Sequence, residues 1–339
     1  MELQKEYDSI CVYIHLERLN SNIIKYKSLI QDLTLKANKR LDILIHCNEI
    51  VDLLNDNHLW KKWKEVESLL SNFYVMTSQK TYQCGKILLD VNVIFDKWCD
   101  YDIFIEDSWD ILVLTNKNDI EEIEDINEQR YNMELSKLKY IYNSFFDVKT
   151  ETDIEIENTE EPTCFLENNG SNKDCHPTVA LGGTFDHLHN GHKILLSISA
   201  WIASKKIICG VSDDELLKNK KGAELLEPIY QRCYNVQKFL YRIRRNLIYY
   251  IIPIHNGYGP TIVEKDIQAI VGSLETLNGC RAVNNKRELF DFPLLDIFSI
   301  SLLAPKSKNL GLEDAVLKMS SSSIRLHLLG QNESEDKPI

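Results

Sequence analysis

The sequence has few glycines and prolines and no long apolar segment. Its 339 residues include 13 Gly and 8 Pro, a share well below that of collagen-like or low-complexity chains. The longest stretch without Asp, Glu, Lys or Arg, residues 246–263, is interrupted by Asn, His, Gly and Pro. It therefore lacks the run of about 20 apolar residues that a membrane-spanning helix needs. We expect a soluble, globular protein whose length favours two domains.

The cysteines show no pairing pattern. There are 9 of them, an odd number, and no C-x-x-C occurs, which argues against both a disulfide framework and a cysteine-based zinc site. The opening residues, MELQKEYDSI, lack the basic and apolar regions of a signal peptide and the arginine-rich character of a transit peptide. We therefore expect a cytoplasmic protein with reduced thiols.

Charge is unevenly distributed along the chain. The formal net charge of -12 argues against a general nucleic-acid-binding protein. Within residues 176–330, however, Lys and Arg outnumber Asp and Glu, whereas the rest of the chain is strongly acidic. The C-terminal half alone suits an anionic substrate.

An acidic segment, residues 151–175, divides the chain. Its composition, ETDIEIENTEEPTCFLENNGSNKDC, offers little apolar periodicity and is typical of a segment that buries too little surface to order itself. The sequence therefore predicts an N-terminal domain over residues 1–150, a linker over 151–175, a second domain over 176–330 and a tail over 331–339.

Both predicted domains contain alternating strand and helix patterns. In the first, which we expect to be the smaller, apolar runs at residues 10–16, 41–47, 87–95 and 111–115 predict strands of an α/β or α+β fold, with a helix over residues 59–70. A further helix is expected from residue 120 through residue 142. In the second, strands predicted at residues 178–182, 207–211, 248–254, 267–271 and 297–303 alternate with helices. This series predicts a Rossmann-like parallel sheet that binds ligands at the carboxyl ends of its strands.

One stretch carries chemistry: LGGTFDHLHNGH, residues 181–192, between the first strand and the first helix of the second domain. Its glycines allow a ligand to approach the backbone, and a helix starting near Asn190 directs free N–H groups and a positive dipole at that ligand. His189 and His192 stand three residues apart at the helix start and share a face, so both can hydrogen-bond one phosphoryl group. The stretch therefore predicts a phosphate site.

Other interpretations of this stretch fit less well. A metal site at His187, His189 and His192 lacks a cysteine or a second carboxylate to complete it. A purely structural turn has no use for three histidines. The dinucleotide-binding motif G-x-G-x-x-G and the P-loop G-x-x-x-x-G-K-[ST] are both absent.

The pattern G-G-T-F-D-x-x-H-x-G-H resembles the signature of the nucleotidylyltransferase superfamily, and MSSSSIR at residues 319–325 resembles its second signature, I-S-S-T-x-I-R. Residues 178–330 further resemble the phosphopantetheine adenylyltransferases of eukaryotes and archaea. The stretches CGVSDDELLKNK, GPT, SLET and AVNNKR, which follow in this order after residue 208, carry that similarity. Without a P-loop, the chain is similar to the fungal form, which performs only the adenylyl transfer.

This resemblance implies transfer of AMP from ATP to 4'-phosphopantetheine in coenzyme A biosynthesis, with Mg²⁺ accompanying ATP and with neither nucleic acid nor membrane as partner. The catalytic residues it implies are His192, Lys218 and Thr184. Those implied to bind the nucleotide are Gly182, Gly183, Phe185, His189, Gly191, Ser320, Ser321, Ser322 and Arg325. Residues weakly assigned to substrate binding are Asp186, Lys220, Ser273, Glu275, Asn284 and Arg287, and no residue is assigned to a metal.

Two alternatives stay open at this point. The chain could be another small-substrate nucleotidylyltransferase, or a nucleotide-binding scaffold that gathers other enzymes of coenzyme A biosynthesis. Class I aminoacyl-tRNA synthetases share related signatures, but the chain is short for one.

Overall fold

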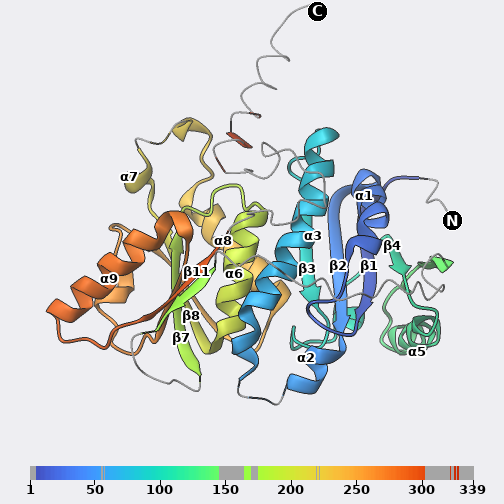
Figure 1. The fold of residues 1–339 in the computed structure, drawn as a ribbon. Coiled ribbons are helices and arrows are strands. Elements are labelled where there is room, and N and C mark those ends of the chain that lie inside the picture. The colour runs from blue at the N-terminus through green and yellow to red at the C-terminus, as the bar shows by residue number, and fades with distance from the viewer. Residues whose placement is uncertain are drawn as a thin grey trace, which may run out of the picture. The chain divides into compact units, whose positions relative to one another are not determined.

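The chain divides into two compact units (Figure 1). A computed structural model describes residues 5–54, 56, 58–144, 164–168, 175–218, 220, 222–301, 321, 324, 325 and 327. The N-terminal unit comprises Met1–Asp56, Ser68–Thr159 and Ile243–Arg245, and the C-terminal unit comprises Asn57–Glu67, Glu160–Arg242 and Asn246–Ile339.

The N-terminal unit is built on a parallel sheet with the strand order β3-β2-β1-β4-β5. Because its described strand pairs are all parallel and helices connect them, this unit is α/β rather than α+β. The strands are β1 (Tyr7–Leu16), β2 (Ala37–Cys47), β3 (Asp90–Phe95), β4 (Ile111–Leu114) and β5 (Tyr140–Tyr142). The helices are η1 (Ile24–Tyr26), α1 (Lys27–Lys36), α2 (Asn48–Leu53), η2 (Leu59–Lys62), α3 (Trp63–Gln83), α4 (Ile103–Glu106) and α5 (Asp119–Asn132), of which η2 and the start of α3 belong to the C-terminal unit.

The C-terminal unit holds a second sheet, with the strand order β6-β11-β10-β7-β8-β9. Only its edge pair, β11 with β6, is antiparallel among the described strands. The strands are β6 (Phe165–Glu167), β7 (His176–Gly183), β8 (Ala203–Ser212), β9 (Ile248–Ile254), β10 (Ala269–Ser273) and β11 (Asp296–Ile300). The helices are α6 (Asn190–Ile202), α7 (Asp214–Leu217), η4 (Ala223–Leu225), α8 (Ile229–Ile243), η5 (Gly259–Ile262), η6 (Leu274–Thr276) and α9 (Leu277–Leu289). The predicted Rossmann-like parallel sheet is confirmed.

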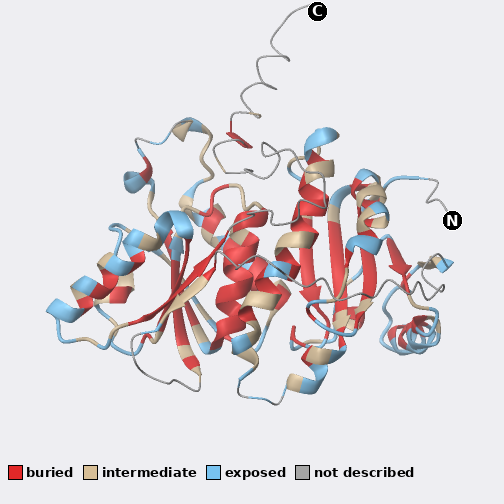
Figure 2. Ribbon diagram, in the orientation of Figure 1, coloured by how far each residue is buried: buried red, intermediate tan, exposed pale blue. Residues whose placement is uncertain are grey.

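The described strands other than β5, β6 and β9, which lie at sheet edges, contain runs of buried apolar residues because helices cover parallel strands. In β1, Ile10, Val12 and Ile14 are fully buried, and Figure 2 shows the strands of both units largely in red. Helix α6 is buried along nearly its whole length. A central helix of this kind fixes the position of its N-terminus firmly, and that end carries the predicted histidines.

A short segment of early sequence packs into the C-terminal unit. The ring of Trp60 lies edge-on to His176 at 4.7 Å, Trp63 lies edge-on to Phe298 at 5.4 Å, and the Trp201 indole donates to the Leu59 carbonyl at 3.1 Å. The predicted second domain, residues 176–330, therefore omits aromatic side chains that cover its own core.

Two predicted boundaries differ from the structure. The helix expected to run from residue 120 through residue 142 ends at Asn132, and Tyr140–Tyr142 is strand β5. Alternation of tyrosine and isoleucine suits a strand better than a helix. Of the predicted linker, the structure describes residues 164–168 and 175, and Phe165–Glu167 is strand β6, paired with β11.

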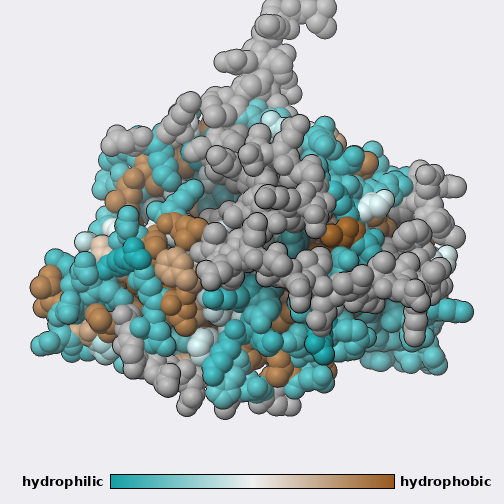
Figure 3. Space-filling model, viewed as in Figure 1, coloured by the Kyte–Doolittle hydropathy of each residue, from teal (hydrophilic) through white to brown (hydrophobic). Residues whose placement is uncertain are grey.

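No helix among the described residues is long and apolar enough to cross a membrane. The face drawn in Figure 3 is mostly hydrophilic, with smaller hydrophobic areas scattered over it.

Candidate active site

The loop between β7 and α6, residues 184–189, turns sharply at the carboxyl end of the sheet. Phe185 and His187 both adopt positive φ, at 51° and 42°, a conformation uncommon for residues other than glycine. The Phe185 ring is fully buried, and a Cβ atom on Gly183 would lie 3.0 Å from it. Glycine at 183 therefore lets the ring fold against the strand end, and this burial holds the loop in shape.

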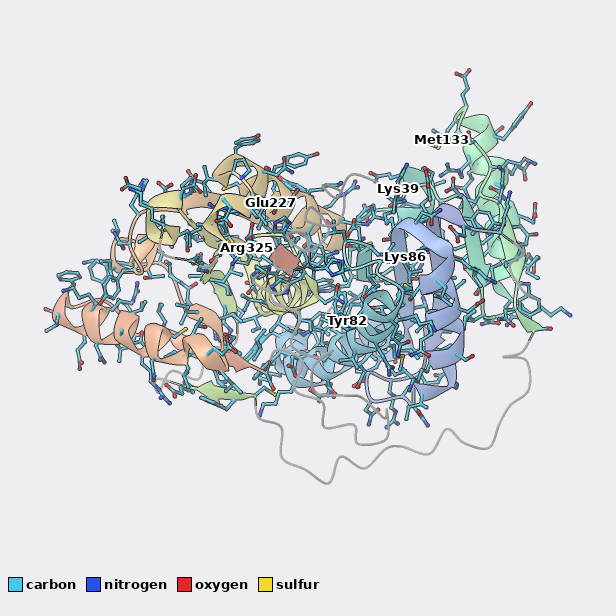
Figure 4. The ribbon with its side chains drawn as sticks, turned by 90° about the horizontal axis from the view of Figure 1, so that it is seen from above. Lys39, Tyr82, Lys86, Met133, Glu227 and Arg325 are labelled. Atoms are coloured by element: carbon cyan, nitrogen blue, oxygen red, sulfur yellow. The ribbon has the colours of Figure 1, made fainter. Side chains whose placement is uncertain are left out.

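Asp186 ties this loop to two other segments. Its carboxylate accepts a hydrogen bond from the Glu227 backbone N–H at 2.9 Å and pairs with the Arg325 guanidinium at 2.5 Å, and its carbonyl accepts from the Ser321 hydroxyl at 2.8 Å. Figure 4 labels Glu227 and Arg325. Because the Asp186 side chain is fully buried and already paired, it organises the site and does not present its carboxylate to a substrate.

His187 faces the segment that precedes α8. Its backbone N–H donates to the Glu227 carboxylate at 2.7 Å, and its Nε2 lies 3.0 Å from the Leu225 carbonyl oxygen. It therefore fixes the loop and does not join the other two histidines. In the described part of the chain, no group of three or more His, Cys, Asp or Glu side chains is arranged to hold a metal ion.

His189 and His192 form a stacked pair at the start of α6. Their ring centroids are 3.8 Å apart with 25° between the planes. Burial lowers the pKa of His189 to about 4 and, together with the nearby charges of His189 and Lys220, lowers that of His192 well below its usual value. Both imidazoles are therefore neutral donors at pH 7. Their Nδ1 atoms are buried and have no hydrogen-bond partner among the described residues, a feature typical of sites that a ligand completes.

A lysine reaches this pair from the loop after β8. The Lys220 ammonium donates to the Thr184 hydroxyl at 2.6 Å, and burial, followed by the nearby Arg325 charge, lowers the pKa of Lys220. Lys218 points elsewhere, with its ammonium 3.3 Å from the Glu215 carboxylate and its side chain 69% exposed. In this structure Lys220 contacts Thr184, whereas Lys218, predicted to be catalytic, lies on the exposed surface; the catalytic role of either lysine stays a prediction.

Sequence analysis missed Arg232, a fully buried residue of α8. Its guanidinium donates to the carbonyls of Thr184, Ser212 and Glu227 at 2.9, 2.7 and 2.8 Å and pairs with Asp214 at 2.5 Å. It therefore joins the end of β8, the start of α8 and the loop residue Thr184. A signal was available, because an arginine stands on the helical face whose other members, Val236, Phe239, Leu240 and Ile243, are all apolar.

Three of the residues weakly assigned to the substrate, Ser273, Asn284 and Arg287, make hydrogen bonds within the C-terminal unit. Ser273 and Thr276 form a capping box at the start of η6, and Glu275 is exposed. The Asn284 side-chain amide donates to the Leu295 carbonyl and accepts from the Leu295 backbone N–H. Arg287 is fully buried and donates to backbone carbonyls. The Asn284 and Arg287 side chains thus bond to the backbone of their own unit, and their assignment to the substrate stays a prediction.

The remaining predicted residues have simpler positions. Gly182 and Gly183 end β7, opposite Gly210 and Val211 of β8. Gly191 lies in the first turn of α6. Ser320 and Ser322 fall outside the described residues.

Comparison with known proteins gives this arrangement a context. A family model described as cytidylyltransferase-like matches residues 180–326. A protein of Schizosaccharomyces pombe described as uncharacterized is 33% identical over 324 residues, which cover 94% of this chain and 96% of that protein. The phosphopantetheine adenylyltransferase of Saccharomyces cerevisiae is 31% identical over 263 residues, 77% of each chain. That of Pyrococcus furiosus is 37% identical over 157 residues, 46% of this chain and 92% of its own.

The fold, the stacked histidines at a helix start and the cytidylyltransferase-like match define a nucleotidylyltransferase. The extent of similarity to the yeast protein places the chain more narrowly. It belongs to the phosphopantetheine adenylyltransferase family, as its motifs predicted.

Proposed function

We propose that this protein transfers AMP from ATP to 4'-phosphopantetheine, forming dephospho-coenzyme A and pyrophosphate. The observation that carries the proposal is the meeting of Lys220 and Thr184 with the stacked His189 and His192. These groups suit a phosphate chain, and relatives named phosphopantetheine adenylyltransferase support the choice of substrates. The predicted adenylyl transfer stays a proposal for this chain.

In the proposed reaction, a phosphate oxygen of phosphopantetheine attacks the α-phosphorus of ATP. The bond from that phosphorus to the α,β-bridging oxygen breaks, and pyrophosphate takes the electron pair as it leaves. Both reactants are anions, so the site's task is alignment and charge neutralisation, without a protein nucleophile. His192 and Lys220 would stabilise the α-phosphoryl group, while Thr184 and His189 orient the phosphates.

Arg325 and Ser321 would act near the leaving pyrophosphate. Arg325 is held by Asp186 and its charge lowers the pKa of Lys220, so the two cations lie close to each other. Mg²⁺ would accompany the nucleotide, held by its phosphates and by water, and would neutralise triphosphate charge.

The proposal is tested by pyrophosphate release from ATP with a panel of phosphorylated acceptors. We expect turnover with 4'-phosphopantetheine and little with nicotinamide mononucleotide, glycerol 3-phosphate or phosphocholine. Mass spectrometry of the product should find dephospho-coenzyme A. Turnover with a different acceptor would favour another small-substrate nucleotidylyltransferase, and nucleotide binding without turnover would favour a scaffold.

The same assay examines the missing P-loop. Because the sequence lacks G-x-x-x-x-G-K-[ST], the purified protein should make dephospho-coenzyme A and stop there. Formation of coenzyme A by the pure protein, ATP and phosphopantetheine would contradict this expectation.

A further inference from the structure

The two units share one strand order. In the N-terminal unit the sheet runs β3-β2-β1-β4-β5, and in the C-terminal unit the strands taken in the same sense run β9-β8-β7-β10-β11, with β6 added at the edge. Numbered from the first strand of each unit, both sheets have the order 3-2-1-4-5. This topology is common among nucleotide-binding folds, so agreement of order alone does not relate the two units.

The agreement extends to register. The pairing of β1 with β2 shifts between Tyr7 and Ser9, and the pairing of β7 with β8 shifts between His176 and Thr178, each with one extra residue on the second strand. In both units the first α-helix runs directly into the second strand, which begins with alanine, at Ala37 after α1 and at Ala203 after α6.

A hydrogen bond at the start of the first strand also recurs. The Ser9 backbone N–H donates to the Asp110 carboxylate at 2.9 Å, and the Thr178 backbone N–H donates to the Gln268 amide oxygen at 2.7 Å. In return, the Asp110 backbone N–H donates to the Ser9 carbonyl, and the Gln268 backbone N–H donates to the Thr178 carbonyl. In both units, therefore, the residue before the fourth strand, β4 or β10, is hydrogen-bonded to the start of the first strand, β1 or β7.

The most specific agreement is a clamp made by an Asn and an Arg three residues apart on the helix that precedes the fifth strand of each sheet, α5 before β5 and α9 before β11. Asn127 of α5 exchanges two hydrogen bonds with the backbone of Leu138, and Asn284 of α9 does the same with Leu295, each 11 residues further on. The arginines, Arg130 and Arg287, each donate from Nε to a carbonyl 6 residues later.

Two further hydrogen bonds of each arginine reach backward by equal distances along the chain. Arg130 Nη1 donates to carbonyls 26 and 23 residues earlier, those of Phe104 and Asp107, and Arg287 Nη1 donates to Thr261 and Glu264 at the same separations. Four matched sequence separations in one buried network are not required by a shared strand order. They indicate a shared origin for the two units.

We infer that the N-terminal unit is a second copy of the nucleotidylyltransferase fold that has lost its nucleotide site. Aligned from the shared register shift, Gly182, Gly183 and Thr184 correspond to Tyr13, Ile14 and His15. Counted back from the second strand of each unit, His189 and His192 correspond to Ile23 and Tyr26. Counted forward from it, Lys220 corresponds to Leu54.

The strand end of the N-terminal unit carries large side chains in place of the glycines. Tyr13 and Ile14 are buried where the C-terminal unit has two glycines, and Tyr13 donates to Asp96 at 2.9 Å. His46 also pairs with Asp96 at 2.9 Å, and His15 lies 2.9 Å from Asp119. An internal network of side chains thus occupies the edge of the sheet where the other copy presents a ligand site.

The cavity beside this network repels anions. It measures about 820 Å³ and is lined by Asp96, Asp100, Asp102, Glu121, Glu122 and Asp125, together with Lys97. A nucleoside triphosphate would meet a concentration of like charge there. The N-terminal unit therefore keeps the architecture of the fold without its nucleotide chemistry.

Comparison of the two units also distinguishes residues of the C-terminal unit that stabilise the fold from residues that we assign to the reaction. The clamp of Asn284 and Arg287 is present in both units, including the one without catalytic histidines, so its task is common to both folds. Lys220 and the stacked histidines occur in the C-terminal unit and have no counterpart at the aligned positions of the other. These unshared residues are the ones that carry the chemistry.

The test has two arms on the full-length protein, and only its choice of nucleotide rests on the proposed function. First, calorimetric titration with the non-cleavable α,β-methylene-ATP and Mg²⁺ should give one site per chain. Two sites per chain would overturn the loss of nucleotide binding in the N-terminal unit. Complete absence of binding would instead contradict the proposed function.

Second, the matched variants Arg130→Met and Arg287→Met should each lower the unfolding midpoint of the protein by roughly 4 °C or more, because each leaves buried carbonyls without donors. The milder Arg130→Lys and Arg287→Lys serve if the first pair fails to fold. Arg281→Met, which removes an exposed pair with Glu167, is the control. If the position 287 variants keep their midpoint and raise KM for a substrate, the clamp is not architectural and the duplication argument fails.

Discussion

Lys220 donates a hydrogen bond to the Thr184 hydroxyl at 2.6 Å, whereas Lys218, two residues earlier, pairs with Glu215 one turn behind it. Helix α7 ends at Leu217, so the two lysines leave the helix in different directions. A motif match places both in the same loop but does not decide which enters the site. In this structure it is Lys220 that contacts Thr184, and we therefore predict the catalytic role for Lys220.

Replacement of Lys220 and of Lys218 should therefore have different effects on kcat. We expect Lys220→Ala to lower kcat by about 10² to 10³, as for loss of one preorganised donor to the transition state. Lys218→Ala should change kcat by less than about twofold, since its exposed pair with Glu215 contributes little. Steady-state kinetics with saturating ATP measures both. A larger loss in Lys218→Ala than in Lys220→Ala would restore the assignment made from sequence.

Arg232 offers a test of the scaffold beneath the site. Arg232→Met leaves three carbonyls without their donor and removes the pair with the exposed Asp214, so we expect a loss of about 2 to 4 kcal/mol in the free energy of unfolding of the protein. Arg281→Met, on an exposed helix face, should cost less than about 1 kcal/mol. Urea unfolding compares the two. Equal effects would mean that Arg232 does not anchor the loop.

Much of the fold follows from local sequence. Strand β9 spans the predicted residues 248–254, and α6 begins at Asn190 as its glycine and histidine pattern indicates. Buried parallel strands and amphipathic helices leave strong periodic signals, so their positions and the loop between β7 and α6 could be recognised. The superfamily and the parallel sheet were confirmed for the same reason.

The parts that sequence could not supply depend on contacts between distant residues. Arg232 acts on Thr184, 48 residues away, and Asp186 on Arg325, 139 residues away. The duplication is equally hidden, because the clamp needs only an Asn and an Arg in each copy and leaves the rest of the helix free to change. Such relationships have no periodic signature and are visible only in the folded chain.

Glu67 should make stability depend on pH. It is 6% exposed in α3, and burial raises its pKa to about 7, although hydrogen bonds with the Ser301 backbone and the Cys164 side chain oppose the rise. The folded state therefore holds the proton more tightly than the unfolded state, and stability falls as pH rises from about 4.5 to 7.

Glu67→Gln, which resembles the protonated acid, should remove this loss. We expect the variant to gain about 1 to 3 kcal/mol over the natural protein at pH 8 and little at pH 4.5. The exposed Glu65→Gln is the matched control and should leave the pH dependence unchanged. Unfolding midpoints measured across this pH range decide the matter. Equal pH profiles for Glu67→Gln and the natural protein would show that Glu67 is not protonated in the folded state.

His192 carries the last prediction. Burial and neighbouring positive charge lower its pKa, so the imidazole is neutral at pH 7 and can act only as a hydrogen-bond donor or acceptor. If it donates to the α-phosphoryl group mainly in the transition state, His192→Ala should lower kcat by about 10² to 10³ and change ATP affinity much less. Because a lowered pKa keeps the neutral form as pH falls, kcat of the natural protein should show no loss centred near pH 6.5, the ordinary pKa of histidine.

Rapid-quench kinetics and ATP titration of the variant, with a pH profile of the natural protein, provide the measurements. Near-full kcat in His192→Ala, or a loss of ATP binding with kcat unchanged at saturation, would make His192 a binding or structural residue. A fall in kcat centred near pH 6.5 that His192→Asn abolishes would instead show that its proton is lost and gained in the working range.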